Sequence, residues 1–208
     1  MGLRTLLGLK KAPTPRPPLE PIGGVRPRLW GRDYRRRFGT GDWTERYRPL
    51  LELAIDYRGK TVLDAGCNLG IVGYEISKLG PASYHGVDSY QPALEVARAI
   101  FSGVSVVHRF DRVDLRRHDR LARVLSPTYD IVLFLSVYQH IANRNGHECA
   151  QKTLSLLAGH CAGLFVATCI ERDETEVVAV LKTAGLDMKS ANSASVPRKA
   201  HYLLFARR

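Results

Sequence analysis

Short apolar runs alternate with amphipathic stretches from about residue 60 onward. Apolar runs bounded by glycine, proline or polar turns predict strands, whereas apolar residues three and four positions apart predict helices. The predicted strands cover residues 61–65, 84–87, 104–108, 131–135, 164–168, 186–190 and 201–206. The predicted helices cover residues 70–79, 92–101, 144–158 and 174–184, and an earlier one covers 42–57.

This order of elements predicts an α/β fold. Strands that are separated by helices form a parallel sheet with helices on both faces. Residues 131–135 are apolar throughout, which is typical of a strand buried on both faces. The last two strands lie close enough in the chain to pair in antiparallel fashion. We therefore expect a doubly wound, mostly parallel seven-stranded sheet that ends in an antiparallel strand.

The first 50 residues differ in composition from the rest of the chain. They hold 12 Lys or Arg, four acids and seven of the 11 prolines, so +8 of the net charge of +11 lies there. A proline-rich segment lacks backbone donors and apolar periodicity. We expect a basic Pro/Arg-rich leader over 1–40, partly disordered or capping the domain, and a folded domain over 41–208. The leader is either a cover or an anion-binding arm.

Composition also narrows the class of protein. The chain is 45% hydrophobic and 25% charged, as in soluble globular proteins. No stretch approaches the roughly 18 consecutive apolar residues of a membrane-spanning helix. The four cysteines show no C-x-x-C spacing, so no metal site is expected. Free thiols suit a reducing, cytoplasmic setting.

The most informative stretch is Val-Leu-Asp-Ala-Gly-Cys-Asn-Leu-Gly at residues 62–70. In doubly wound sheets a strand, a glycine turn and a helix form the crevice that holds a cofactor. Gly66 allows the backbone to approach a ligand, and Gly70 lets the turn enter the helix. Asp88 ends the next strand, where a carboxylate can accept both hydroxyls of a ribose. The turn lacks the G-x-G-x-x-G pattern of dinucleotide folds and the Gly-Lys-Ser/Thr ending of a P-loop.

From about residue 43 to 208 the chain resembles the class I S-adenosylmethionine-dependent methyltransferases. Their first motif, D-x-G-C-G-x-G, is matched by Asp64-Ala-Gly-Cys-Asn-Leu-Gly70, with Asn68 in place of the middle glycine. The resemblance implies a Rossmann-like methyltransferase with S-adenosyl-L-methionine as its cofactor. It places Asp64 near the methionine amino group and Asp88 on the ribose.

The resemblance also implies a complete set of cofactor-binding residues. Phe110 or Asp111, after the third strand, would edge the adenine. The family's fourth motif resembles residues 129–141. The predicted cofactor-binding residues are Asp64, Gly66, Cys67, Asn68, Gly70, Asp88, Ser89, Phe110, Asp111, Leu135 and Ser136.

The methyl acceptor should lie beside residues 135–141, Leu-Ser-Val-Tyr-Gln-His-Ile. A hydroxyl acceptor must lose a proton, and His140 is the candidate catalytic base because imidazoles titrate near neutral pH. Tyr138 is the second candidate catalytic residue and would wall the pocket. The alternatives are that His140 packs under the cofactor and that Tyr138 belongs to the core. A phosphate or an unprotonated amine would need no base.

The same stretch is similar to the S-V-x-H-H-I segment of methyltransferase domains that cap bacterial O-antigen polysaccharides. Residues 195–199 also resemble that group's ending. This kinship suggests a glycan or sugar-phosphate acceptor, and Arg198 and Lys199 would suit a phosphate.

The sequence leaves three functions open. The first is methyl transfer to a small-molecule or glycan acceptor, possibly an anionic one. The second is an RNA or protein methyltransferase whose basic leader tracks phosphates, although no N/D-P-P-Y motif supports base methylation. The third is a non-catalytic module whose leader holds an anionic membrane or partner.

Overall fold

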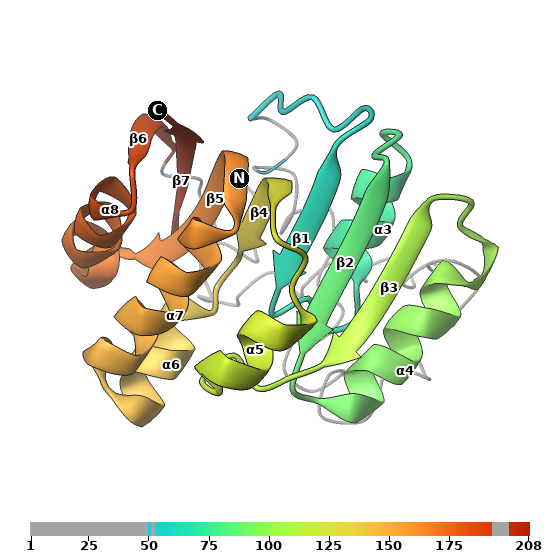
Figure 1. Cartoon of the computed structure of the whole chain (residues 1–208), viewed down its shortest axis with the longest axis horizontal. Helices are drawn as coiled ribbons and strands as arrows, with labels where there is room; N and C mark the ends of the chain where they lie inside the picture. The colour runs from blue at the N-terminus through green and yellow to red at the C-terminus, as the bar shows by residue number, and fades with distance from the viewer. Residues whose placement is uncertain (1–49, 51–52, 193–199) are drawn as a thin grey trace, which may run out of the picture.

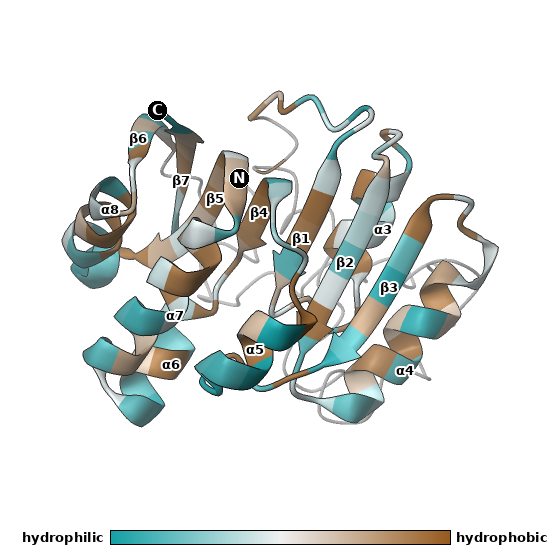
Figure 2. Ribbon diagram, in the orientation of Figure 1, coloured by the Kyte–Doolittle hydropathy of each residue, from teal (hydrophilic) through white to brown (hydrophobic). Residues whose placement is uncertain are grey.

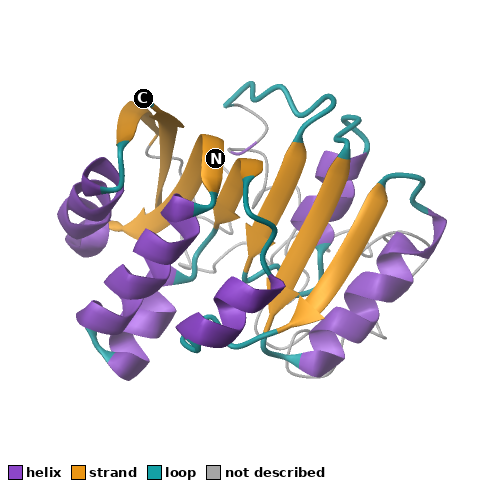
Figure 3. Cartoon of the chain, in the orientation of Figure 1, coloured by secondary structure: helices purple, strands orange, loops and turns teal. Residues whose placement is uncertain are grey.

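The computed structural model describes residues 50, 53–192 and 200–208, which form a seven-stranded sheet with helices on both faces (Figures 1 and 3). The strand order is β3-β2-β1-β4-β5-β7-β6. The strands are β1 Thr61–Ala65, β2 Ser83–Asp88, β3 Val107–Arg112, β4 Tyr129–Phe134, β5 Cys161–Ile170, β6 Leu186–Asn192 and β7 Ala200–Arg207. The first five are parallel and β7 is antiparallel to both of its neighbours. The predicted fold class is confirmed.

The helices divide between the two faces of the sheet. They are α3 Ile71–Ser77, α4 Gln91–Ile100, α5 His118–Val124, α6 Tyr138–Asn145, α7 His147–Gly159 and α8 Glu174–Thr183, with 3-10 turns at Phe101–Gly103 and Glu171–Asp173. Helices α3 and α4 cover one face, and α5 to α8 cover the other. In Figure 1, α5 and α7 lie in front of the sheet and α3 lies behind it. None of the helices in the described ranges is long and apolar enough to cross a membrane.

Successive side chains along each strand point to opposite faces of the sheet, so a separate hydrophobic core forms on each face. Leu63, Val132 and Phe165 pack under α5 to α8, whereas Val62 and Ile131 pack under α3 and α4. Figure 2 shows the resulting pattern, with β1 and β4 largely apolar and the outer surface of α5 hydrophilic. The sheet is thus buried on both sides, as its apolar strands predict.

Strand β7 completes the sheet between β5 and β6. Its Leu203 and Phe205 are fully buried. Near its end, Arg207 donates hydrogen bonds from Nε to the carbonyl of Cys161, at 2.9 Å, and from Nη1 to that of Ala184, at 2.5 Å. The arginine therefore ties the end of β7 to the start of β5 and to the end of α8.

Several predicted elements need correction. The third strand was expected at 104–108 but runs from Val107 to Arg112, where it pairs with β2. Helices α5 and α6 were not predicted. The helix expected at 144–158 is interrupted at Gly146, whose φ of +86° ends α6 before α7 begins. The leader over 1–40, most of the helix expected at 42–57, and Arg198 and Lys199 lie outside the described residues.

Candidate active site

The carboxyl ends of β1, β2, β4 and β5 bring together most of the predicted site residues. The turn after β1 rests on β2, because the amides of Gly66 and Cys67 donate to the carbonyl of Val87 at 2.8 and 3.1 Å. The segment after β4 reaches across to the same turn. A Cβ placed on Gly66 would lie only 2.4 Å from Val137 Cγ2. We refer to the surface between these strand ends as the groove, a name that stands for the position of these residues and not for a measured cavity.

Asp88 is the best-defined polar group of the groove. Its Oδ2 accepts the amide of Asn68 at 2.9 Å, and its Oδ1 accepts the amide of Tyr90 at 2.9 Å. The residue is only partly buried. Because an ionised carboxylate has about four acceptor positions, these two bonds fix its orientation and leave acceptors for two further donors. That is the requirement for holding the paired hydroxyls of a ribose.

In the glycine turn, the residue whose surroundings differ from the expectation is Gly66. Gly66 has a φ of +90°, and Gly70 has a φ of +69° immediately before α3. The space beside Gly66 is occupied by a methyl group of Val137, so this glycine accommodates the start of α6 rather than an open approach to a ligand. Asn68, with a φ of +51°, is exposed on the turn.

Asp64 lies beneath the turn and is only 3% exposed. Its Oδ2 accepts the hydroxyl of Tyr84 at 2.7 Å. Burial raises the pKa of Asp64 to about 7, the Tyr84 hydrogen bond lowers it in part, and the negative charge of Asp88 raises it further. The neighbouring strand β2 thus supplies, through Tyr84, the partner that a buried acid needs. A role of Asp64 toward the methionine amino group stays a prediction.

The raised pKa of Asp64 predicts a pH-dependent stability. Its ordinary pKa is 3.8, so between about pH 4 and 7 the folded protein binds a proton that the unfolded chain does not. The ionised carboxylate therefore destabilises the fold as pH rises. Asp64→Asn lacks this titrating group. We therefore expect the free energy of unfolding of Asp64→Asn minus that of wild type to increase by about 4 kcal/mol from pH 4 to pH 7.5. Urea unfolding at several pH values measures this.

The comparison with Asp64→Asn is required because His85 has the opposite effect. Burial, together with the positive charge of Arg109, lowers the pKa of His85 from 6.5 to about 4. That group alone makes the fold more stable as pH rises from 4 to 6.5. Its contribution is common to both proteins and cancels in their difference. A constant difference across the pH range would contradict the assignment of a raised pKa to Asp64.

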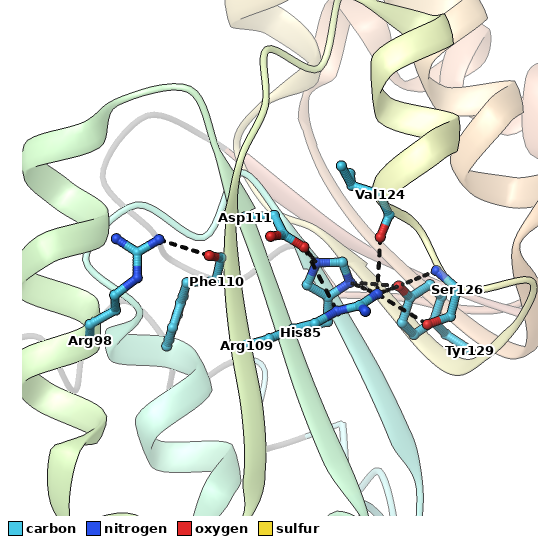
Figure 4. A network of polar contacts seen from close by, with 8 residues as sticks. All are labelled: His85, Arg98, Arg109, Phe110, Asp111, Val124, Ser126 and Tyr129. Atoms are coloured by element: carbon cyan, nitrogen blue, oxygen red, sulfur yellow. Dashed lines mark hydrogen bonds and ion pairs between the residues drawn. The ribbon is translucent and has the colours of Figure 1, made fainter.

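Phe110 and Asp111 lie on opposite faces of the sheet (Figure 4). Phe110 is buried on the side of α4, where Arg98 Nη2 donates to its carbonyl at 2.8 Å. Asp111 Oδ2 lies 3.0 Å from His85 Nε2, and the His85 Nδ1 lies 2.6 Å from the hydroxyl of Tyr129. The Asp111 carboxylate is therefore engaged by this network. Contact of either residue with adenine stays a prediction.

Four predicted residues follow β4. Leu135 is half-buried, Ser136 is exposed with a φ of +59°, and His140 is exposed in the first turn of α6. Tyr138 is 0% exposed and belongs to the core under α6 and α7, so in this conformation it cannot wall a pocket. The core reading of Tyr138 is therefore the one that agrees with its position.

The two remaining predicted residues are Cys67, which lies in the glycine turn, and Ser89, which follows β2. Cys67 is buried, and burial raises the pKa of its thiol well above the ordinary value. Ser89 is exposed directly after Asp88, and its carbonyl accepts Arg112 Nε at 3.3 Å. A buried neutral thiol contributes packing, whereas Ser89 stays at the surface beside the carboxylate.

Three residues of the groove were missed by the sequence reasoning. Tyr90 is 60% exposed beside Asp88, Val137 packs on Gly66, and the hydroxyl of Thr168 accepts the amide of Ser136 at 2.5 Å. The sequence does contain a signal for Tyr90, because an aromatic residue stands two positions after the predicted ribose acid. The contacts of Val137 and Thr168 join distant parts of the chain.

Helix α6 is tied to the loops on both of its sides. Arg116 Nη1, which precedes α5, donates to Asn145 Oδ1 at 2.9 Å. Arg172 Nη2, which follows β5, donates to Asn143 Oδ1 at 2.6 Å. Both bonds are exposed, so each is worth little alone. Together they hold the C-terminal half of the helix that carries His140.

The residues present fit an adenosyl amino acid at the ribose end. Asp88 retains free acceptors there, and the exposed Asn68 and Tyr90 stand on either side of it. Among the described residues, no group of three or more His, Cys, Asp or Glu side chains is arranged to hold a metal ion.

Part of the chain is similar in sequence to known methyltransferases. Residues 63–161 match the family model described as a methyltransferase domain. A ubiquinone biosynthesis O-methyltransferase of Bordetella avium is 33% identical over 98 residues, 46% of this chain. A relative of the same name from Shewanella sp. is 33% identical over 85 residues, 40% of this chain. The matches span only 38% and 34% of the lengths of these two proteins.

Solved structures share the fold over most of the chain. Magnesium protoporphyrin IX methyltransferase from Synechocystis PCC 6803, solved with bound S-adenosylmethionine, has a TM-score of 0.68 at 17% identity and covers 87% of this chain and 88% of its own. A TehB-like methyltransferase from Corynebacterium glutamicum has a TM-score of 0.63 at 18% identity, covering 85% and 95%. In the match of residues 63–161 and in its fold, the chain is similar to the S-adenosylmethionine-dependent methyltransferases.

Proposed function

We propose that this chain transfers the methyl group of S-adenosylmethionine to a hydroxyl oxygen of a small-molecule acceptor. The observation that carries the proposal is the arrangement of the groove. Asp88 is oriented by two backbone amides at one end, and the exposed Ser136 and His140 follow β4 at the other. The names of the relatives, which are O-methyltransferases, support oxygen as the acceptor atom.

The cofactor, when bound, supplies a methyl group that is already activated by its sulfonium charge. The protein then has to align an acceptor oxygen and remove its proton. Asp88 would hold the ribose hydroxyls, and Ser136 would contact the acceptor. His140 would take the proton as the carbon–oxygen bond forms and the carbon–sulfur bond breaks. The products are a methyl ether, S-adenosylhomocysteine and a proton on the imidazole.

The choice among a sugar hydroxyl, a phosphate and a macromolecular acceptor depends on sequence features. A glycan hydroxyl belongs to the proposed class, and the similarity of residues 135–141 to the O-antigen group supports it. A phosphate acceptor depended on Arg198 and Lys199, which lie outside the described residues. An RNA or membrane partner depended on the leader, which lies there as well. We therefore propose a hydroxyl of a small molecule or sugar.

The test uses the full chain, S-adenosylmethionine and three probes: catechol, methyl α-D-mannoside and benzylamine. We expect S-adenosylhomocysteine and an O-methylated product with at least one of the two hydroxyl probes, as detected by mass spectrometry. His140→Ala should lower the rate at pH 7 by about 100-fold, the low end for general-base catalysis. The loss should shrink at high pH, where the acceptor ionises unaided.

Two results would contradict the proposal. One is the absence of S-adenosylhomocysteine binding by calorimetry. The other is methylation of benzylamine without methylation of either hydroxyl probe, which would make the chain an N-methyltransferase. His118→Ala is the control for His140, because His118 lies on α5 with its Nε2 3.0 Å from Thr153 Oγ1, away from the groove.

A further inference from the structure

Two residues of the groove have a backbone conformation that side chains disfavour. Asn68 has a φ of +51° and Ser136 a φ of +59°. Left-handed conformations are uncommon outside glycine, and they persist where the surrounding structure enforces them. Asn68 follows β1 and Ser136 follows β4, so both lie where adjacent strands end at the same edge of the sheet.

The two residues are held in the same way. The amide of Asn68 donates to Oδ2 of Asp88, from β2, at 2.9 Å. The amide of Ser136 donates to Oγ1 of Thr168, from β5, at 2.5 Å. In each case a side-chain oxygen from the neighbouring strand fixes a strained backbone amide. Asp88 does this at the ribose end of the groove, and Thr168 does it at the other end.

Thr168 is suited to a fixed role because it is only 2% exposed. Its hydroxyl oxygen accepts the amide of Ser136, and it lies 3.3 Å from the hydroxyl oxygen of Ser136. If the Thr168 proton is directed to that oxygen, the Ser136 proton is left to donate outward, since each hydroxyl has one donor. Ser136 is exposed, so a ligand in the groove can accept a hydrogen bond from its hydroxyl.

We propose that Thr168 is a positioning residue for the methyl acceptor. It holds Ser136 in the left-handed conformation, so that the Ser136 hydroxyl donates a hydrogen bond to the acceptor oxygen while His140 removes the proton of that oxygen. The inference rests on the proposed function and specifies which residues select a hydroxyl acceptor. Thr168 itself touches neither the cofactor nor the acceptor.

The test compares Thr168→Val, which keeps the branched shape but loses the hydroxyl, with Thr168→Ser, which keeps the hydroxyl. With the hydroxyl probe that wild type methylates, we expect Thr168→Val to lower kcat by at least about tenfold, because small misplacements of a reacting group are costly. Thr168→Ser should stay within about threefold of wild type. S-adenosylhomocysteine affinity, measured by calorimetry, should change less than about twofold in both.

A double-mutant comparison shows whether Thr168 acts through Ser136. Glycine adopts a left-handed conformation without support, so Ser136→Gly keeps the backbone and loses the hydroxyl. In a Ser136→Gly background, Thr168→Val should cost no further activity. Ser136→Ala leaves Thr168 in place and should also lower kcat about tenfold, which keeps the proposal testable if Thr168→Val does not fold. The inference places Ser136 at the acceptor and not at the cofactor, as the resemblance implies, so S-adenosylhomocysteine affinity of this variant should change less than about twofold.

Three results would contradict the role proposed for Thr168. Equal rates for Thr168→Val and Thr168→Ser would overturn the inference, as would full activity of Ser136→Ala. A tenfold cost of Thr168→Val that persists beside Ser136→Gly would show that Thr168 acts elsewhere. These results leave the proposed function intact if wild type still binds S-adenosylhomocysteine and methylates a hydroxyl probe. A wild type that does neither removes the proposed function, and the inference with it.

Discussion

Asp88→Ala should weaken the binding of S-adenosylhomocysteine by about 1000-fold. Two charge-assisted hydrogen bonds to ribose hydroxyls are worth about 3–6 kcal/mol together, and each 1.4 kcal/mol is tenfold in affinity. The substitution also releases the amides of Asn68 and Tyr90, which Asp88 holds at 2.9 Å each. Isothermal titration calorimetry measures the change, with the free energy of unfolding measured in parallel.

The matched control is Asp119→Ala, which removes an exposed carboxylate from the first turn of α5. It should leave the affinity for S-adenosylhomocysteine unchanged. A loss of less than about tenfold in Asp88→Ala would mean that the ribose is held elsewhere, since even one charged hydrogen bond is worth about that much. The groove would then need a different anchor.

Gly73→Ala should destabilise the protein by about 3 kcal/mol or more, the upper range for overpacking a buried site. A Cβ on this residue of α3 would lie 2.1 Å from Cζ of Tyr84. That ring cannot easily move, because it stacks on Phe101 with centroids 5.1 Å apart and its hydroxyl is bonded to Asp64 at 2.7 Å. Urea unfolding measures the loss.

Gly159→Ala is the control for this substitution. Gly159 ends helix α7, and a Cβ there would meet nothing within 4 Å. We expect a change within about 1 kcal/mol, toward greater stability, because alanine favours a helix more than glycine does. Equal effects of the two substitutions would show that the contact between α3 and Tyr84 is looser than its geometry implies.

The strands were predictable where burial on both faces makes the signal continuous. Residues 131–135 are apolar throughout, and β4 was predicted within two residues. Strand β3 is an edge strand with an exposed Val107, and its later residues are polar because Arg109 and Asp111 pair with His85. The apolar residues that precede β3 led to a predicted start at residue 104, whereas the strand begins at Val107. The register was fixed by pairing with β2, which no local pattern reveals.

The short helices escaped prediction for a related reason. Helix α6 buries only Tyr138, Ile141 and Ala142 among its eight residues. Such a helix owes its stability to tertiary contacts more than to its own sequence. Its ties to Arg116 and Arg172 come from loops 29 positions away in each case. Neither contact is visible in the apolar pattern.

The positions of the candidate cofactor-binding residues could be predicted from local order, whereas the contacts after β4 could not. The glycine turn and Asp88 lie directly at the ends of β1 and β2, so local order was enough to place them at one edge of the sheet. The link between Ser136 and Thr168 spans 32 positions, and the one between Asp64 and Tyr84 spans 20. An acid in an apolar strand signals that a partner exists. Only the folded chain shows which residue it is.

The position of β7 between β5 and β6 has a consequence for biosynthesis. As the polypeptide leaves the ribosome, strands β1 to β5 can pair before β7 is made, whereas β6 has no neighbour until β7 arrives. Thr168 faces Tyr202 of β7 across that last pairing. The part of the sheet that carries Asp64 and Asp88 can therefore form during translation, whereas the pairing beside Thr168 forms only after β7 has been made.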